Sequence, residues 1–174
     1  MPFEPSSELA AYAEKVVQRY PERRSAIMMI LHALQREQGC ISLEAQEWVA
    51  GFLGIAPINV REVVSFYPFY REHPVGKRHI RVCRTLSCAL NGGYAVCDSF
   101  KQAFDTGLDE ISPDGRVTIE FAECLASCGT APVALVDDDL HENLTPEKVR
   151  ELCESIKAET PAAPPPAPAG ETAE

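Results

Sequence analysis

Two cysteines lie in the stretch VCRTLSC (residues 82–88), and two more lie in ECLASCG (residues 123–129). Four residues separate the cysteines of the first pair, three separate those of the second, and 35 residues lie between the pairs. Each pair follows a short hydrophobic run typical of a β-strand. We therefore expect two strands of one sheet to hold both loops together at one end. The four cysteines are Cys83, Cys88, Cys124 and Cys128.

Four cysteines in two pairs are compatible with more than one metal. A [2Fe–2S] cluster takes four thiolates, two on each iron. Structural zinc also binds four cysteines, usually with gaps of about two residues within a pair and with gaps of up to about four permitted. The spacing alone leaves the iron–sulfur cluster and zinc equally open. A disulfide framework is less favoured, because the cysteine count of 7 is odd and the N-terminus lacks a secretion signal. The other cysteines, Cys40, Cys97 and Cys153, are expected to be buried and inert.

Composition excludes several classes of protein. The chain has 174 residues, of which 45% are hydrophobic, so it can bury the core of one domain or of two small ones. A net charge of −10 argues against a nucleic-acid partner, which requires a basic surface. No apolar run approaches the length of a membrane helix, so no direct membrane insertion is expected. The acidic N-terminus resembles neither a signal peptide nor a transit peptide, which favours a cytoplasmic location.

Helical periodicity covers the N-terminal part of the chain, which we predict to be a small helical bundle over residues 1–72. Serines that can cap a helix and glycines that can end one delimit most of its segments. The aromatic run SFYPFY (residues 65–70) is expected to plug the core between two subdomains, with a partner interface as the alternative. The expected helices span residues 7–20, 22–38, 42–53 and 57–64.

After the linker HPVGK (residues 73–77) the pattern changes to short strands and two helices. The order is β-α-β-β-β-α, which predicts a thioredoxin-like sandwich over residues 73–159 and an α+β chain as a whole. The Pro/Ala-rich segment 160–174 is expected to be a disordered tail, because its prolines disfavour both helix and strand. The expected strands span residues 77–83, 116–121, 132–136 and 140–143, and the expected helices 94–106 and 145–158.

Several motifs together resemble one known family. They are YP at residues 20–21, SAI at 25–27, LHALQ at 31–35, VVSFY at 63–67, PVGK at 74–77 and the two cysteine stretches. In this order they are similar to the small, thioredoxin-like [2Fe–2S] subunit of respiratory complex I, over about residues 8–157. The sequence departs from the family at Cys40, where an aromatic residue is usual, and at Ala126, where glycine is common. Neither departure falls on a cysteine of the two pairs.

The resemblance implies one [2Fe–2S] cluster, held by Cys83, Cys88, Cys124 and Cys128, and favours it over zinc. It implies a non-catalytic redox subunit of NADH:quinone oxidoreductase, without a substrate site of its own. The NADH and FMN would be bound by the partner flavoprotein subunit, and further iron–sulfur subunits would complete a complex on the cytoplasmic face of the inner membrane. The related diaphorase units of NAD-reducing hydrogenases and NAD-dependent formate dehydrogenases remain open, as does a non-redox, zinc-stabilised interaction module.

Overall fold

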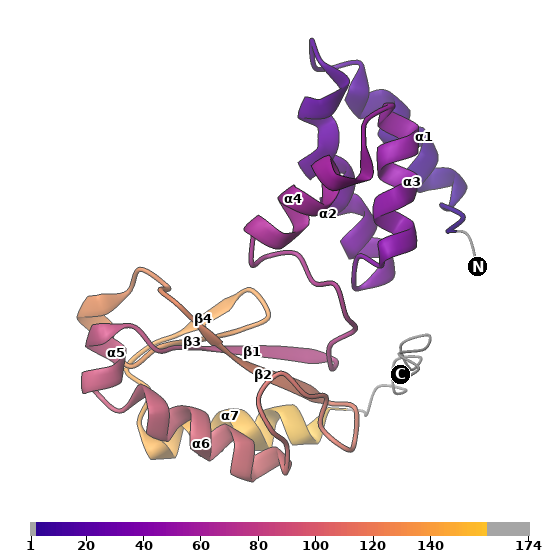
Figure 1. The fold of residues 1–174 in the computed structure, drawn as a ribbon. Coiled ribbons are helices and arrows are strands. Elements are labelled where there is room, and N and C mark those ends of the chain that lie inside the picture. Colours follow the sequence, from indigo (N-terminus) through magenta and orange to yellow (C-terminus); the bar gives the residue numbers. More distant parts are fainter. Residues whose placement is uncertain (1–2, 160–174) are drawn as a thin grey trace, which may run out of the picture. The chain divides into compact units, whose positions relative to one another are not determined.

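The computed structural model describes residues 3–159, which divide into two compact units (Figure 1). The described part of the first unit comprises residues 3–74, and that of the second comprises residues 75–159. Each unit has its own hydrophobic core. The tail predicted for residues 160–174 lies outside the described residues. No helix within residues 3–159 is both long enough and apolar enough to cross a membrane.

The first unit is the predicted helical bundle. The side chain of Ser6 caps the first helix by accepting from the Leu9 N–H, and Ser42 caps the third by accepting from the Ala45 N–H. Gly39 and Gly54 end the second and third helices in the left-handed conformation, as glycine at these positions predicts. The helices are α1 (Ser7–Val17), a 3₁₀ turn η1 (Arg23–Ala26), α2 (Ile27–Gln38), α3 (Leu43–Leu53) and α4 (Pro57–Phe66).

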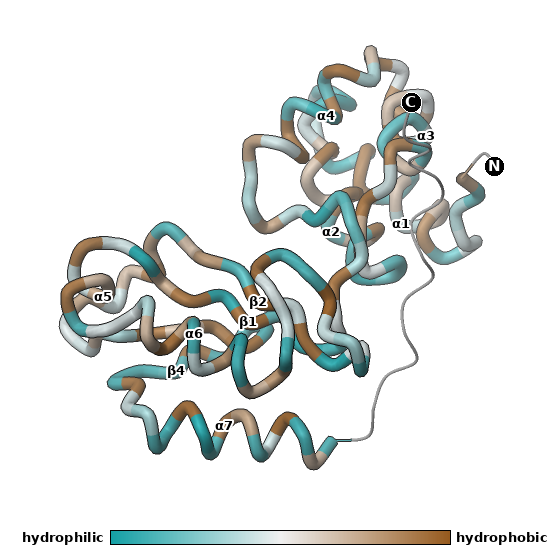
Figure 2. The backbone as a smooth tube through the Cα atoms, turned by 60° about the horizontal axis from the view of Figure 1, so that its bottom comes forward, coloured by the Kyte–Doolittle hydropathy of each residue, from teal (hydrophilic) through white to brown (hydrophobic). Residues whose placement is uncertain are grey.

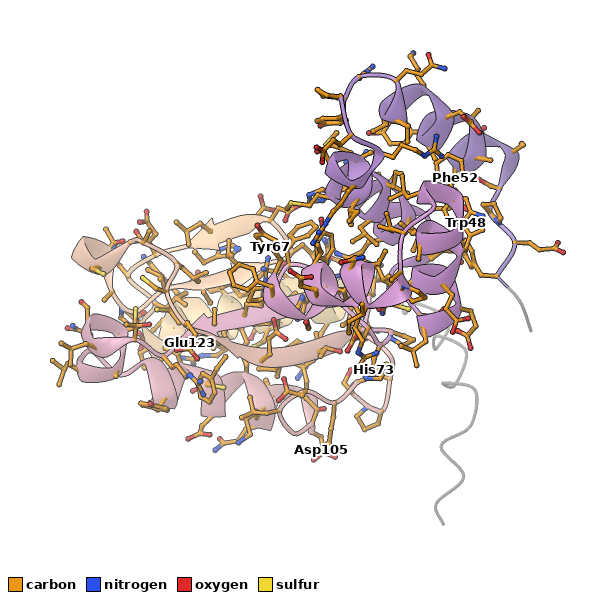
Figure 3. All side chains as sticks on the ribbon, turned by 45° about the horizontal axis from the view of Figure 1, so that its top comes forward. Trp48, Phe52, Tyr67, His73, Asp105 and Glu123 are labelled. Atoms are coloured by element: carbon orange, nitrogen blue, oxygen red, sulfur yellow. The ribbon has the colours of Figure 1, made fainter. Side chains whose placement is uncertain are left out.

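The core of the bundle is formed by the apolar stripes of these helices. The side chains of Ile30, Leu31 and Leu34 on α2 are fully buried. On α3, Trp48 and Phe52 stack with their ring centroids 5.6 Å apart, and Figure 3 shows the two side by side on that helix. The bundle is therefore closed by packing between helices, without contribution from the cysteine pairs.

The aromatic run at residues 65–70 is not the core plug that we expected. Phe66 is 73% exposed and Phe69 is 45% exposed, so the prediction is wrong for both. Only Tyr70 joins the core of the first unit, where its hydroxyl donates to the Met28 carbonyl oxygen at 3.2 Å and burial raises its pKa to about 12. The buried amide of Gln35 holds the same segment by bonding the backbone on either side of Tyr70.

The second unit contains a four-stranded sheet in the order β2-β1-β3-β4. Strands β1 and β2 are parallel, whereas β3 runs antiparallel to both of its neighbours. This topology confirms the predicted thioredoxin-like order of elements. The short helix α5 was not expected. The elements are β1 (Arg78–Cys83), α5 (Leu86–Leu90), α6 (Gly93–Phe104), β2 (Val117–Ala122), a 3₁₀ turn η2 (Cys128–Thr130), β3 (Ala134–Val136), β4 (Asp139–His141) and α7 (Pro146–Ala158).

Helices α6 and α7 pack on the same face of the sheet (Figure 1). Phe100 on α6 is fully buried against Ile80 of β1 and Ile119 of β2, within one cluster that also includes α7 residues. Hydrophobic and hydrophilic residues alternate along α7 with the period of an amphipathic helix (Figure 2). This packing holds the strand ends, and with them the cysteine loops, in fixed positions.

Candidate metal centre

Both cysteine loops leave the sheet from neighbouring strand ends. Cys83 is the last residue of β1 and is paired in register with Ala122, the last residue of β2. Because β1 and β2 are parallel, their carboxyl ends lie at the same edge, and Cys124 follows only two residues after Ala122. Figure 3 shows Glu123 at this end of the sheet. Both cysteine loops therefore follow strand ends at the same edge of the sheet, as the sequence predicted.

The first loop folds back into α5, which carries Cys88. Cys83 and Cys88 are both buried, with exposed fractions of 3% and 2%. The loop is packed directly under the start of α6: a Cβ added at Gly93 would lie 2.9 Å from the carbonyl oxygens of both Cys83 and Cys88. Only glycine permits this approach without displacement of the loop. The sequence indicated Gly93 as part of a turn, but it did not indicate this packing role.

The second loop is more open, since Cys124 and Cys128 are both exposed. Ala126 between them adopts the left-handed conformation, with φ of 57°. Its backbone N–H donates to the Sγ of Cys124 at 3.4 Å. Cys128 begins the 3₁₀ turn η2, which leads into β3. The left-handed residue therefore turns the backbone so that an N–H group faces a thiol.

Direct contacts join the two loops. The Sγ of Cys83 lies 3.7 Å from the carbonyl oxygen of Glu123, to which its thiol form donates. The hydroxyl of Ser87 donates to the carbonyl oxygen of Cys128 at 2.9 Å. Arg84 and Glu123 form an exposed ion pair between the residues that flank Cys83 and Cys124, with Nε 3.0 Å from Oε1. The structure thus brings the two cysteine pairs to one place, as the sequence predicted.

The pKa values of the two thiols of the first cysteine pair are shifted in opposite directions. Burial opposes ionisation of Cys83, but donation from the N–H groups of Thr85 and Leu125 and from the Cys88 thiol outweighs it, so the pKa of Cys83 is lowered. The pKa of Cys88 is raised by burial and by its neighbour Cys83, despite an N–H bond from Val133. Cys128 of the second loop also contributes to the raised pKa of Cys88.

The remaining cysteines have a different environment. Cys97 and Cys153 are buried in the core of the second unit, and burial raises the pKa of each to about 11. These two thiols therefore stay protonated at neutral pH, as expected for inert cysteines. Cys40 is only partly buried, so the expectation of full burial is wrong for this residue, although desolvation still raises its pKa.

The donors at the candidate site fit a [2Fe–2S] cluster. Backbone N–H groups reach the sulfur atoms of three of the four cysteines, from Thr85 and Leu125 to Cys83, from Val133 to Cys88 and from Ala126 to Cys124. Such donors stabilise the negative charge of a thiolate-bound cluster. Within residues 3–159 no group of three or more His, Cys, Asp or Glu side chains is close enough together to hold a metal ion. A cluster places two thiolates on each of two irons, which the two loops can supply as pairs.

Sequence reasoning missed one polar group beside the second loop. Glu142, just after β4, accepts hydrogen bonds from the hydroxyls of Ser127 and Thr130, on either side of Cys128. A lone glutamate after a short strand has no distinctive sequence signal. Its relation to the site depends on the pairing of β3 with β4, which places the end of β4 next to η2.

A thioredoxin-like sheet with two cysteine loops at the ends of neighbouring parallel strands defines a class of small iron–sulfur domains. A family profile described as thioredoxin-like [2Fe–2S] ferredoxin matches residues 13–157 of this chain. The chain belongs to this family, and the cofactor of the family is a [2Fe–2S] cluster.

Relatives from Mycobacterium and Thermus are similar over most of the chain. A subunit of the NADH-quinone oxidoreductase of Mycobacterium bovis is 39% identical over 158 residues, which are 91% of this chain and 63% of the relative. NADH-quinone oxidoreductase subunit 2 of Thermus thermophilus is 38% identical over 84% of this chain and 83% of its own length. The chain therefore spans less than two thirds of the mycobacterial relative but most of the Thermus one.

Solved structures also share the fold. An NAD+-reducing [NiFe]-hydrogenase in the air-oxidized state matches with a TM-score of 0.65 and 22% identity, covering 75% of this chain and 23% of that chain. At this identity the match supports the fold alone.

Replacing Ala126 by glycine should stabilise the second unit. A non-glycine residue in the left-handed conformation costs about 1–2 kcal/mol, and glycine loses about 0.5–1 kcal/mol more chain entropy on folding. We expect a net gain of about 0.5–1 kcal/mol, measured as a higher urea midpoint of the second unit. Ala89→Gly in the short helix α5 is the matched control and should lower the midpoint. A shift of the midpoint in the same direction for both substitutions would show that backbone strain at Ala126 does not limit the stability of the unit.

Proposed function

We propose that this chain is an electron-transfer subunit of an NADH-oxidising respiratory complex, NADH:quinone oxidoreductase. In this proposal, it holds one [2Fe–2S] cluster and exchanges single electrons with the FMN of a flavoprotein partner, which binds the NADH. The names of the relatives support the complex, since both are subunits of NADH-quinone oxidoreductase. The chain would be a redox subunit, attached through its partners to the cytoplasmic face of the inner membrane.

We further propose that Cys83, Cys88, Cys124 and Cys128 are the cluster ligands. The single observation that carries this assignment is the pair of contacts that link the loops, from Cys83 Sγ to Glu123 O and from Ser87 Oγ to Cys128 O. When bound, the cluster supplies a centre that can accept one electron, which adds one negative charge. The chain's own residues would stabilise that charge through the N–H donors of Thr85, Leu125, Ala126 and Val133.

Two exposed apolar surfaces are suited to a protein partner. The first comprises Leu86, Leu90 and Tyr94, which are 72%, 78% and 52% exposed on α5 and α6 beside Cys88. Exposed large apolar side chains of this kind mark interaction sites. A partner that exchanges electrons with the cluster must approach the cysteine loops, so we assign this surface to the flavoprotein.

The second surface lies on the first unit, in the aromatic run, where Phe66 and Phe69 are 73% and 45% exposed. Aromatic side chains that stay exposed on one unit are typical anchors of protein interfaces. This surface contains the aromatic residues for which the sequence left a partner interface open. We propose that it also docks the flavoprotein subunit.

The proposal is tested by reducing the complex with NADH. The chain co-purified with its flavoprotein partner should show the EPR signal of a reduced [2Fe–2S] cluster after NADH addition, whereas the chain alone should need dithionite. Leu90→Glu and Phe66→Glu should weaken co-purification, because each places a charge on a proposed docking surface. Leu140→Glu is the control, since Leu140 is 44% exposed on β4 and belongs to neither of the two proposed surfaces. A colourless protein with one zinc per chain would contradict the proposal.

A diaphorase unit of an NAD-reducing hydrogenase or of an NAD-dependent formate dehydrogenase is the alternative within the same class. An NAD+-reducing [NiFe]-hydrogenase shares the fold, and the fold alone does not separate the two kinds of complex. The large subunits that co-purify with the chain separate them, because a nickel–iron subunit would identify a hydrogenase. Quinone-dependent oxidation of NADH would instead support the respiratory complex.

A further inference from the structure

The hydroxyl groups of Ser127 and Thr130, on either side of Cys128, both contact the carboxylate of Glu142. The Ser127 and Thr130 hydroxyl oxygens both lie within hydrogen-bond distance of Oε1 of Glu142 and 2.7 Å from each other, and Thr130 Oγ1 also lies 3.2 Å from the Ser127 carbonyl oxygen, so their two protons are shared among these acceptors. A hydroxyl has only one proton to donate. While these bonds last, neither hydroxyl has a proton available for a sulfur atom at Cys128.

Glu142 is held in place by the backbone around it. The N–H of Asn143 donates to the Thr130 carbonyl oxygen at 2.7 Å, and that of Leu144 donates to the Pro132 carbonyl oxygen at 3.0 Å. Lys148 Nζ donates to the Glu142 carbonyl oxygen at 3.1 Å. The segment after β4 is thus joined to the loop of Cys128 on both sides of the glutamate. The carboxylate therefore has a defined position relative to η2.

The carboxylate is ionised under physiological conditions. Donation from Ser127 and then from Thr130 lowers the pKa of Glu142, which is exposed. Reduction of a cluster adds a negative charge, so a nearby anion disfavours it and a hydrogen-bond donor to sulfur favours it. An ionised Glu142 should therefore lower the reduction potential of the cluster in two ways: by its own negative charge, and by keeping two hydroxyl donors from the sulfur.

We propose that Glu142 is a positioning residue that orders the loop of Cys128 and holds the cluster at a low reduction potential. The inference rests on the proposed ligand set, because it requires Cys128 to bind the cluster. It assigns the effect to two separable causes: the charge of the carboxylate, and the capture of the Ser127 and Thr130 hydroxyl protons.

A redox titration of the full-length chain, followed by the EPR signal of the reduced cluster, tests the proposal. Glu142→Gln keeps an acceptor oxygen but removes the charge, so the potential should shift to a more positive value. Glu142→Ala also frees the two hydroxyls, so its shift should be larger. Glu154→Gln makes the same charge change at an exposed position on α7, twelve residues farther along the chain. The shift of the reduction potential in this variant should be clearly smaller. Equal potentials for Glu142→Gln and Glu154→Gln would overturn the assignment.

The two causes can be separated. High salt should reduce the shift of Glu142→Gln, because ions screen an exposed charge. Adding Ser127→Ala and Thr130→Ala to Glu142→Ala should remove the extra shift that distinguishes the alanine variant from the glutamine variant. If the extra shift persists without the hydroxyls, proton capture is not its cause.

Hydrogen exchange of the metal-free chain gives a readout that does not need the cluster. Glu142→Ala should speed exchange at the amides of Thr130 and Leu144 severalfold, whereas Glu154→Gln should leave them unchanged. Unchanged exchange in Glu142→Ala would refute the ordering role, even in a chain that binds no iron. A wild-type chain without iron would refute the proposed function and the effect on potential, while exchange would still decide the ordering role.

Discussion

Replacing any one of Cys83, Cys88, Cys124 or Cys128 by alanine should remove most of the iron from the purified protein. Alanine is chosen because it has no donor atom, whereas serine would leave an oxygen that can still bind iron. Loss of a residue that only orients a metal ligand costs roughly 10–100-fold in affinity, so loss of a ligand should cost at least about as much. Iron content per chain and visible absorbance measure the loss.

The controls are Cys97→Ala and Cys153→Ala, which change buried thiols in the core of the second unit. Both variants should keep their iron, because neither thiol belongs to the loops at the strand ends. They also control for a small loss of core packing. Retention of iron in Cys124→Ala together with its loss in Cys97→Ala would show that the proposed ligand set is wrong.

Phe100→Ala should destabilise the second unit by about 3–5 kcal/mol, because it leaves a large cavity in a closely packed core. Phe100 is fully buried between α6 and the sheet that holds both cysteine loops. The total stability of a domain is about 5–15 kcal/mol, so the loss is a large share of it. At a urea dependence of about 2 kcal/mol per molar, the midpoint should fall by about 2 M.

Two signals follow the two units separately in this measurement. The visible absorbance of the cluster reports on the second unit, and the fluorescence of Trp48, the one tryptophan of the chain, reports on the first. We expect the absorbance midpoint to fall and the Trp48 midpoint to stay, because Phe100 belongs to the second core only. Leu140→Ala changes a 44% exposed position, so it should change the free energy of unfolding of either unit by no more than about 0.5 kcal/mol. An unchanged absorbance midpoint in Phe100→Ala would contradict the packing argument.

Much of the fold was predictable because its signals are local. Helices were predicted to begin at Ser6 or Ser7, near Ser42 and at Thr145, and the side chains of Ser6, Ser42 and Thr145 each accept from a backbone N–H in the first turn. Gly39 and Gly54 end helices because they adopt the left-handed conformation at low cost. Such signals act within about four residues, so they can be read without knowledge of the fold.

Other features depended on contacts between distant segments. Phe66 and Phe69 were predicted to be buried on hydrophobicity alone, yet the segment is held by Gln35 and Tyr70, which leaves both rings outside the core. Helix α5 has only five residues, too short for a periodic pattern to reveal. The left-handed Ala126 is set by its place in the second cysteine loop, and alanine has no intrinsic preference for that conformation.

The sequence by itself determined the family, the order of elements and the four candidate ligands, because cysteine spacing, helix caps and strand patterns are properties of short segments. Tertiary structure alone decided how those ligands are surrounded. The parallel pairing of β1 with β2 brings the two loops to one edge, and the pairing of β3 with β4 brings Glu142 to the loop of Cys128. Hydrogen bonds between residues far apart in the chain form only when the sheet has formed, so no local sequence pattern can predict them.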